Sequence, residues 1–349
     1  MTKIKVGVLG ATGAVGQRII QLLENHPWFE VVSLCASEKS AGKSYKDATT
    51  WRVSSKIPDY AANLRVELCE PKLGAKIVFS GLDSSVAGDI EDQFAANDYI
   101  VISNSKNHRM DFDVPLVIPE VNPDHLSLIA AQKKRRAGKG FIVTNPNCTT
   151  VGLTMILKPL HDAFGVKSVA VTSMQALSGA GYPGVASLDA VDNVVPFIQD
   201  EEEKIETEPL KLLGKISNSL VTNASIKISA SCNRVPVRDG HTECLELAFA
   251  KQPTVDDAIK VLNEFTGVPQ QLNLPSAPKK PIIYIGEDDR PQPILDRDIN
   301  NGMSVIVGRI RKSKIMDLRL TLLVHNTIRG AAGAAILNGE LLKAKGFFR

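Results

Sequence analysis

The stretch IKVGVLGATGAVGQRIIQLL (residues 4–23) predicts a strand, a glycine-rich turn and a helix in direct succession. Residues 4–9 form a nearly continuous β-favouring run, typical of a strand that is buried on both faces. Gly10, Gly13 and Gly16 follow, and the next apolar residues recur at helical spacing. Such glycines permit a tight turn, and the helix N-terminus offers free N–H groups to a diphosphate. The context therefore favours a dinucleotide site over a ligand-free turn, although the GxxGxxG spacing departs from the commoner GxGxxG.

The first half continues as an alternation of strands and helices. Further β-favouring runs lie at residues 29–37, 75–81, 99–105 and 140–147, with helices expected at about 86–96 and 124–138. This alternation predicts an α/β fold with a Rossmann-type, doubly wound parallel sheet. Ligands of such sheets bind beyond the carboxyl ends of the strands, where the loops 80–85, 103–110 and 145–150 fall.

The residues after the second strand bear on the choice between NADP and NAD. A site specific for NAD would place an acid here for the ribose hydroxyls. The sequence reads ASEKSAGK, and a 2′-phosphate could be held by Ser37, Lys39, Ser40 and Lys43. Glu38 is a counter-signal, because it could bind ribose hydroxyls or face solvent. NADP is the predicted cofactor.

The second half has a different rhythm. Longer strand-like runs with partial period-2 alternation lie at residues 167–179, 224–237, 242–251, 303–313 and 317–326. Helical patterns are fewer, at about 186–213 and 254–266, and the proline-rich segment 273–293 is expected to be a surface connection. This half therefore predicts an α+β unit with a mixed, largely antiparallel sheet, and a last helix that packs back on the first half.

Composition excludes several classes of function. A length of 349 residues favours two domains, and 44% hydrophobic with 23% charged residues is ordinary for a globular protein. The net charge of +3 and one basic run, 132–140, are too little to argue for nucleic acid. No apolar run reaches the roughly 20 residues that span a bilayer, and the N-terminus does not resemble a leader. Five scattered cysteines predict free thiols in the cytoplasm, with no disulfide framework and no metal site.

Cys148, in VTNPNCTTVG (residues 143–152), lies where a strand ends and a helix should begin. A cysteine there is either a nucleophile or a small core residue. Its place at the carboxyl end of a parallel sheet favours chemistry. Arg234 and His241 flank a turn that could bring them into the same cleft, and a glycine-rich loop at 174–184 carries Gln175. Taken singly, each of these three residues has an ordinary structural explanation.

Together these motifs resemble the aspartate-β-semialdehyde dehydrogenases, and most closely their archaeal and fungal branch. The resemblance runs from GATGAVG through NPNCTT, LSGAGYPG and RVPVRDGHTE to HNTIRGAAGAA, which is essentially the whole chain. It implies an NADP-binding domain at 1–150, completed by the C-terminal helix at 327–349, and a catalytic and dimerisation domain at 151–326. It also implies reversible, NADP-dependent conversion of L-aspartyl-4-phosphate to L-aspartate-4-semialdehyde in lysine, methionine and threonine biosynthesis. A homodimer or homotetramer follows from the same resemblance.

The resemblance also assigns roles to residues. Cys148 corresponds to the nucleophile, His241 to the acid/base group, and Gln175 to a glutamine beside the reacting centre. Arg234 would grip the substrate carboxylate. Substrate phosphate would meet Arg109, with help from Asn147 and Lys211, and the ammonium would meet Glu208, although Glu203 and Glu206 remain alternatives. The implied cofactor contacts are Gly10, Thr12, Gly13, Ala14, Val15, Ser37, Ser40, Lys43, Ser80, Ser178, Gly179 and Asn326.

The expected mechanism is covalent. A Cys148 thiolate attacks the acyl phosphate, hydride from NADPH reduces the thioester, and a proton passes through His241. We expect the pKa of the thiol to fall below its usual value of about 8.5, because a helix N-terminus and a protonated His241 would lie beside it. Backbone N–H groups at the start of the helix would form the oxyanion site.

Two other functions compete with this interpretation. A malonyl-CoA reductase on the same scaffold would need neither a phosphate site nor an ammonium-binding acid, and Asn147 before the cysteine argues against it. N-acetyl-glutamyl-phosphate reductase fits the flanking motifs less well. A non-catalytic NADP-binding sensor would carry a Cys148 that reacts with iodoacetamide no faster than a buried thiol.

Overall fold

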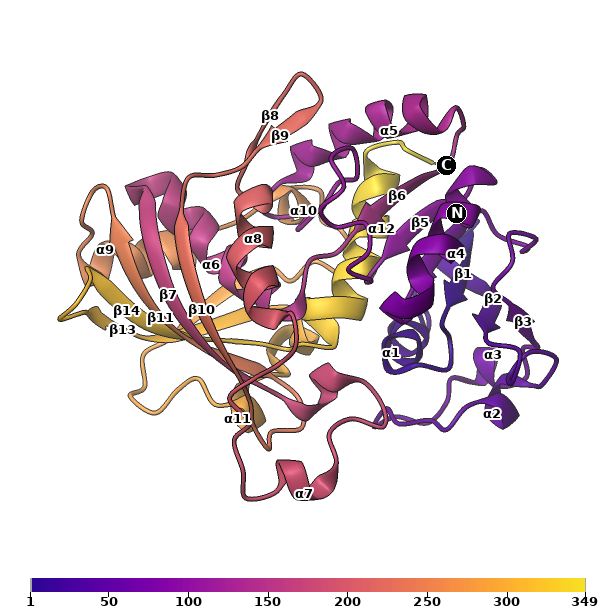
Figure 1. The fold of residues 1–349 in the computed structure, drawn as a ribbon, viewed down its shortest axis with the longest axis horizontal. Helices are drawn as coiled ribbons and strands as arrows, with labels where there is room; N and C mark the ends of the chain where they lie inside the picture. The colour runs from indigo at the N-terminus through magenta and orange to yellow at the C-terminus, as the bar shows by residue number, and fades with distance from the viewer. Residues whose placement is uncertain (1, 349) are drawn as a thin grey trace.

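The computed structural model describes residues 2–348 and contains two six-stranded sheets that lie side by side (Figure 1). The first sheet has the order β3-β2-β1-β4-β5-β6 and is parallel throughout. Its strands are β1 (Ile4–Leu9), β2 (Phe29–Ala36), β3 (Val66–Leu68), β4 (Ile77–Ser80), β5 (Ile100–Ser103) and β6 (Phe141–Thr144). Every residue of β4 and β6 is buried, which explains their continuous apolar sequence. The strand order reverses between β1 and β4, and this point opens the ligand crevice.

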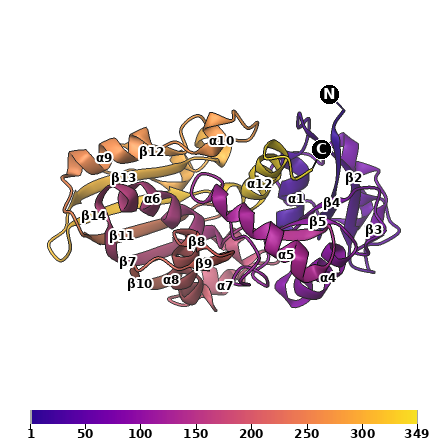
Figure 2. The same ribbon diagram turned by 90° about the horizontal axis from the view of Figure 1, so that it is seen from above.

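Helices cover both faces of this sheet. They are α1 (Ala14–Leu22), α4 (Ser84–Ala96), α5 (Leu128–Arg136) and α12 (Gly333–Ala344), with short turns α2 (Tyr45–Ala48) and α3 (Asp59–Ala62). The predicted helix at 124–138 is a 3-10 turn, η1 (Pro123–Ser127), followed by α5. α12 lies between the two sheets, and Gly339 approaches Phe79 and Ile102 of the first one (Figure 2).

The second sheet is mixed, with the order β10-β7-β11-β14-β13-β12. Its strands are β7 (Val166–Gln175), β10 (Lys227–Arg234), β11 (His241–Phe249), β12 (Ile282–Ile285), β13 (Val305–Lys312) and β14 (Leu318–Val324), and β8 (Lys215–Ser217) pairs separately with β9 (Leu220–Thr222). Three of its five pairings are antiparallel. The apolar residues of α6 (Cys148–Phe164), α8 (Glu201–Leu212) and α9 (Val255–Glu264) pack on the sheet in one core.

Two sequence predictions about this half were wrong. The helix expected at 186–213 is the turn α7 (Ser187–Ala190), an irregular segment and then α8, because Val195 leaves the helical path to pair with Arg234. The segment 273–293 is not a plain connection, since it contains β12 and its last residue begins α11 (Pro293–Asp296). The remaining short elements are η2 (Leu177–Ala180), α10 (Val268–Gln271), η3 (Ile299–Gly302) and η4 (Ile328–Ala332).

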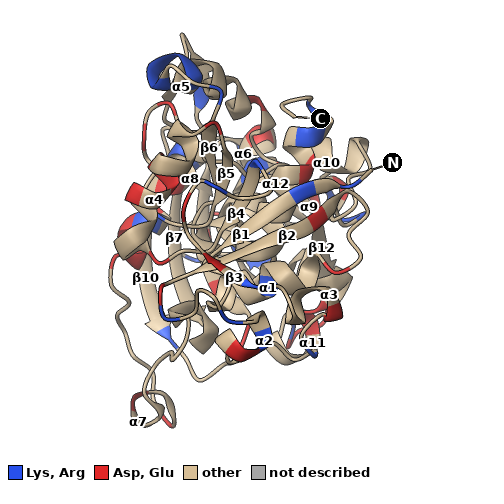
Figure 3. Cartoon of the chain, turned by 90° about the vertical axis from the view of Figure 1, so that its right-hand side faces the viewer, with Lys and Arg blue, Asp and Glu red and all other residues tan. Residues whose placement is uncertain are grey.

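The basic run of the sequence lies on α5 at one end of the molecule (Figure 3). Arg135 pairs with Asp113, and Arg136 pairs with Asp92 at 2.6 Å, so part of its charge is neutralised within the chain. Among residues 2–348, no helix is long and apolar enough to cross a membrane. The same residues hold no group of three or more His, Cys, Asp or Glu side chains placed to bind a metal ion.

Candidate active site

Cys148 is the first residue of α6, and Asn147 caps that helix. The Asn147 side-chain oxygen accepts hydrogen bonds from the backbone N–H groups of Thr149 and Thr150 at 2.9 and 3.3 Å. Gly330, on η4, lies so close that a Cβ there would come within 2.7 Å of the Cys148 Cβ. Cys148 therefore sits at a helix N-terminus beneath the carboxyl end of the first sheet, as the sequence predicts, and the residue as a whole is half-buried.

The ends of three neighbouring strands of the second sheet bring Arg234, Gln175 and His241 together. Arg234 of β10 lies beside Gln175 of β7, and His241 begins β11 next to them. The Cys148 Sγ and His241 Nε2 atoms are 3.2 Å apart. Gly179 lies against this group, since a Cβ there would be 2.8 Å from Arg234 Nη1.

A backbone hydrogen bond decides which nitrogen of His241 carries the proton. The Ala176 N–H donates to His241 Nδ1 at 3.0 Å, so Nδ1 is an acceptor and the neutral ring bears its proton on Nε2. Nε2–H therefore points its hydrogen at the Cys148 sulfur. Burial, followed by the charges of Arg234 and His325, lowers the pKa of His241 to about 3.

The Cys148 thiol differs from the sequence expectation in one respect. Its pKa is raised to about 12, first by burial and then by the charge of Glu201, which outweigh the opposing effects of Arg109, the Thr149 N–H and Arg234. The predicted lowering assumed a protonated His241, and the buried imidazole is neutral instead. In the free protein the two groups therefore form a thiol–imidazole pair with no net charge.

Arg109 lies in the loop after β5, opposite the Cys148 helix. Its Nη1 pairs with Glu208 Oε1 at 2.9 Å, and its Nη2 donates to the Asn104 carbonyl at 2.7 Å. Glu208 also accepts the Asn147 backbone N–H at 2.7 Å. Arg109, Asn147 and Glu208 thus form one buried cluster.

Lys211 supports this loop. Its ammonium donates to the carbonyls of Arg109, Asp111 and Val114 at 2.7 to 3.0 Å, so its three N–H bonds are all directed at the loop. Burial lowers the pKa of Lys211 to about 8. The sequence predicts that Lys211 assists at the substrate phosphate. In this structure the Lys211 ammonium contacts the backbone carbonyl of Arg109 and thereby supports that residue.

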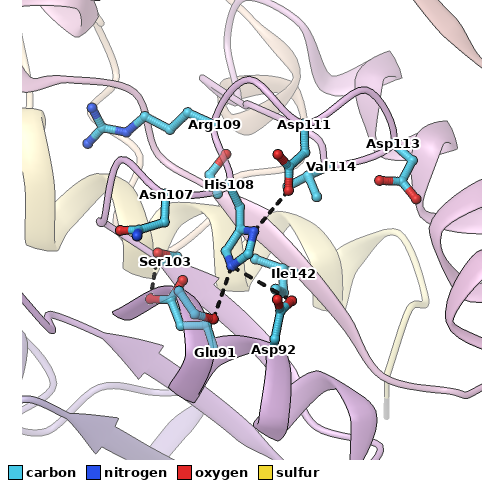
Figure 4. A network of polar contacts seen from close by, with 12 residues as sticks. Glu91, Asp92, Ser103, Asn107, His108, Arg109, Asp111, Asp113, Val114 and Ile142 are labelled. Atoms are coloured by element: carbon cyan, nitrogen blue, oxygen red, sulfur yellow. Dashed lines mark hydrogen bonds and ion pairs between the residues drawn. The ribbon is translucent and has the colours of Figure 1, made fainter. Parts of the chain in front are cut away.

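The other side of the same loop is fixed to α4 by His108 (Figure 4). His108 Nδ1 lies 2.9 Å from Asp111, and Nε2 lies 3.8 Å from Asp92 and 3.4 Å from the Gly88 carbonyl. The Arg109 side chain points away from this network. The loop is therefore held on both sides, which orients the guanidinium of Arg109.

The acids of α8 divide by position. Glu208 belongs to the cluster, Glu203 is exposed, and Glu206 accepts the Ala230 N–H at 2.9 Å on the edge of β10. A fourth acid, Glu201, lies buried against Asn147 and Gln175 and was missed by the sequence analysis. Its helical neighbours are also acids, so the sequence holds no signal that would distinguish it.

The glycine-rich turn fits a dinucleotide. Gly10 and Gly16 leave no room for side chains, since added Cβ atoms would lie 2.7 Å from the Gly81 carbonyl and 2.2 Å from the Gly10 carbonyl. The N-cap residue of α1 is Gly13, which has no side chain to cap the helix. The first backbone N–H groups of α1 are therefore available to a ligand. The expected contacts Thr12 and Gly13 lie on this turn, and Ala14 and Val15 begin α1.

The remaining predicted cofactor residues spread around the same crevice. Ser37, Ser40 and Lys43 lie on the turn after β2, with Ser37 and Lys43 exposed. Asn326 donates to Ser178 Oγ at 2.8 Å beside Gly179, whereas Ser80 is fully buried at the end of β4. A cavity of about 480 Å³ opens between Ala14 and Ser178, and its lining includes three cations that the sequence analysis did not select: Arg18, Arg52 and Arg238.

Known proteins resemble this chain over nearly its whole length. Residues 5–129 match the NAD-binding domain of semialdehyde dehydrogenases, and residues 157–329 match their dimerisation domain. The aspartate-semialdehyde dehydrogenase of Archaeoglobus fulgidus is 54% identical over 341 residues, covering 97% of this chain and 98% of that protein. The chain belongs to the aspartate-semialdehyde dehydrogenase family.

Other members of the aspartate-semialdehyde dehydrogenase family align over the whole chain. The protein from Schizosaccharomyces pombe is 50% identical over 353 residues, covering 98% of each chain. The crystal structure of the aspartate-semialdehyde dehydrogenase from Candida albicans with NADP has a TM-score of 0.92 at 45% identity, and covers 99% of this chain and 100% of that one. The predicted family and the predicted fold class, a parallel sheet with a mixed second sheet, are confirmed.

Proposed function

We propose that this protein is an NADP-dependent aspartate-semialdehyde dehydrogenase, which interconverts L-aspartyl-4-phosphate and L-aspartate-4-semialdehyde. The observation that carries the proposal is the pairing of Cys148 with His241 at 3.2 Å beside two buried arginines, Arg109 and Arg234. Relatives at 44–54% identity bear the name of this enzyme, which supports it over the acyl-CoA reductase. Its products would serve lysine, methionine and threonine biosynthesis in the cytoplasm.

The substrate carries an anion at each end and an ammonium group. We assign its carboxylate to Arg234 and its phosphate to Arg109, because a guanidinium binds either anion with two parallel hydrogen bonds. Asn147 would border the phosphate side through its backbone contact with Glu208, and Lys211 keeps Arg109 in place. Glu208 is assigned to the ammonium, since of Glu203, Glu206 and Glu208 it is the one within the cluster.

The cofactor site is assigned to the glycine-rich turn and the crevice around it. The N–H groups of α1 would hold the diphosphate, and Ser37, Ser40 and Lys43 would hold the 2′-phosphate. Ser178, Gly179 and Asn326 would orient the nicotinamide beside His241. When bound, NADPH supplies the hydride that reduces the acyl group on Cys148.

Cys148 and His241 would carry out the acyl transfer and control the charge on sulfur. As the bond from Cys148 Sγ to the acyl carbon forms, the bond from that carbon to phosphate oxygen breaks, and the thiol proton leaves on phosphate. The His241 Nε2–H stabilises negative charge on sulfur during attack, and again when sulfur departs from the reduced carbon. The released thiolate then takes up a proton from solvent, which restores the neutral thiol. The Ala176 N–H donates to the lone pair of His241 Nδ1, which opposes uptake of a proton there. A hydrogen-bond donor role for His241 therefore fits this structure better than the predicted acid/base role. Gln175 would lie beside the reacting carbon.

The unit at 1–150 with 327–349 would hold the cofactor, and 151–326 would supply catalytic groups and the subunit contact. The match to a dimerisation domain supports self-association. We propose a homodimer or homotetramer, which sedimentation equilibrium would distinguish by mass.

One assay tests the proposed function. Aspartate semialdehyde, phosphate and NADP⁺ should give absorbance at 340 nm, while malonyl-CoA with NADPH should not be consumed. Cys148→Ser should lower turnover by about a thousandfold or more, because the covalent step is lost. NADP binding by Cys148→Ser, followed by fluorescence, should stay within a few-fold of the parent. Full activity of that variant, or turnover with malonyl-CoA alone, would remove the proposal.

A further inference from the structure

Glu201 is a buried acid that contacts two residues of the proposed active site. Its two carboxylate oxygens each accept from Asn147 Nδ2 at 3.0 Å, and Oε2 also accepts from Gln175 Nε2 at 3.2 Å. Only 8% of the residue is exposed. Lys204 supplies the neutralising charge, with its Nζ 2.8 Å from Oε1.

These contacts fix the orientation of both carboxamides. An ionised carboxylate only accepts hydrogen bonds, so it holds the NH₂ end of each amide toward itself. The oxygen of Asn147 is thereby turned to the N–H groups of Thr149 and Thr150, where it caps the helix that begins with Cys148. The oxygen of Gln175 is turned away from Glu201, and among residues 2–348 no donor meets it.

The backbone holds Glu201 in this place. Asp200, the residue before it, adopts a left-handed backbone conformation with φ of 60°, which residues other than glycine rarely occupy. Lys106, from the loop that carries Arg109, pairs with Asp200 at 2.7 Å. Such a conformation persists where the surrounding contacts over-determine it, and it clusters at functional sites. Asp200 and Glu201 thus tie the start of α8 to both sides of the site.

We propose that Glu201 is a positioning residue for the reaction, which holds Asn147 and Gln175 so that the helix cap of Cys148 and the Gln175 oxygen are both fixed. This inference rests on the proposed function for the roles of those two residues. The charged or titratable groups that respond to Glu201 are Lys204, Arg234, Cys148 and Cys232. Because Glu201 is the second cause of the raised pKa of Cys148, its effect on the thiol is measurable without turnover.

The test compares Glu201→Gln with Glu201→Asp and with Glu202→Gln. Glu202 is the next residue of α8, and it accepts the Cys232 N–H outside the proposed site, so it is the matched control. A neutral amide at position 201 lets both carboxamides turn over and removes the charge. We expect Glu201→Gln to lower kcat about 10- to 100-fold while KM for the semialdehyde changes less than about threefold. Glu201→Asp should recover part of the loss, and Glu202→Gln should behave as the parent.

The second readout is alkylation of Cys148 by iodoacetamide at pH 8.5, followed by peptide mass spectrometry. Glu201→Gln should react at least about threefold faster than the parent, because the thiolate is no longer disfavoured by the adjacent charge. Unchanged kcat, or unchanged alkylation in both Glu201 variants, would overturn the inference. If the parent protein lacks the proposed activity, the alkylation rates still decide the effect of Glu201, so the two failures are distinguishable.

Discussion

Among single residues, the Cys148 thiol is strongly affected by its surroundings. Burial raises its pKa to about 12, so little thiolate exists at neutral pH in the free protein. We predict that iodoacetamide at pH 7.5 modifies the exposed Cys244 before Cys148, and that the rate at Cys148 rises steadily from pH 8 to pH 11. Site-resolved mass spectrometry measures both. A Cys148 that reacts fastest at pH 7.5 would contradict the neutral pair.

The alkylation rate of Cys148 therefore does not distinguish a non-catalytic sensor from an enzyme. Slow alkylation was expected of a non-catalytic thiol, but a catalytic thiol whose pKa is raised by burial beside a neutral His241 gives the same result. Loss of turnover in Cys148→Ser is therefore the observation that separates them. The sequence predicted Cys148, His241, Gln175 and Arg234 from motifs, and the structure brings these residues together. It did not reveal Glu201 or the His241 tautomer, because these depend on contacts between residues 54 and 65 positions apart, Asn147 with Glu201 and Ala176 with His241.

Among the elements, η4 is fixed to the segment before η1 by one buried ion pair. Arg329 and Glu120 are both fully buried at the side chain, and two hydrogen bonds of 2.9 and 2.6 Å link them. The same η4 places Gly330 against Cys148. A buried pair of this kind stabilises little over an apolar substitute, but removing one partner leaves a charge without compensation.

Arg329→Met should therefore lower the free energy of unfolding by about 3–5 kcal/mol, measured by urea denaturation. The double variant Arg329→Met with Glu120→Leu should recover much of this loss, because no charge remains in the core. A single variant that loses less than about 1 kcal/mol would show that Glu120 finds solvent or another partner.

Elements were predictable where the local sequence alone decides them. β4 and β6 are short, fully buried and apolar, so their pattern is unambiguous. β12 was missed because prolines at 275, 278 and 281 precede it and mask a four-residue edge strand. The helix at 186–213 was overextended because Val195 pairs with Arg234, a contact between distant parts of the chain.

In the whole molecule, two buried groups, His241 and Glu243, change the free energy of unfolding in opposite directions as pH rises. His241 has a folded pKa of about 3, below its ordinary value of 6.5, so stability falls as pH decreases through 6.5 toward 3. Glu243, two residues further along β11, is fully buried, and burial raises its pKa well above 4.5. Its unfolded form loses a proton first, so stability falls as pH rises above 4.5. The fold is therefore most stable between the ordinary pKa values of the two groups, 4.5 for Glu243 and 6.5 for His241.

Glu243→Gln separates these effects. Neither carboxylate oxygen of Glu243 has a hydrogen-bond partner among residues 2–348, and Oε1 lies where a Cβ on Gly152 would approach within 2.9 Å. An amide keeps this shape but cannot ionise, so the variant should gain stability over the parent progressively above pH 4.5. The gain should grow by up to about 1.4 kcal/mol per pH unit, until the folded form of the parent also loses its proton. Urea denaturation at pH 4.5, 6.5 and 8.5 measures it, and a gain that does not change with pH would mean that Glu243 is ionised in the folded protein.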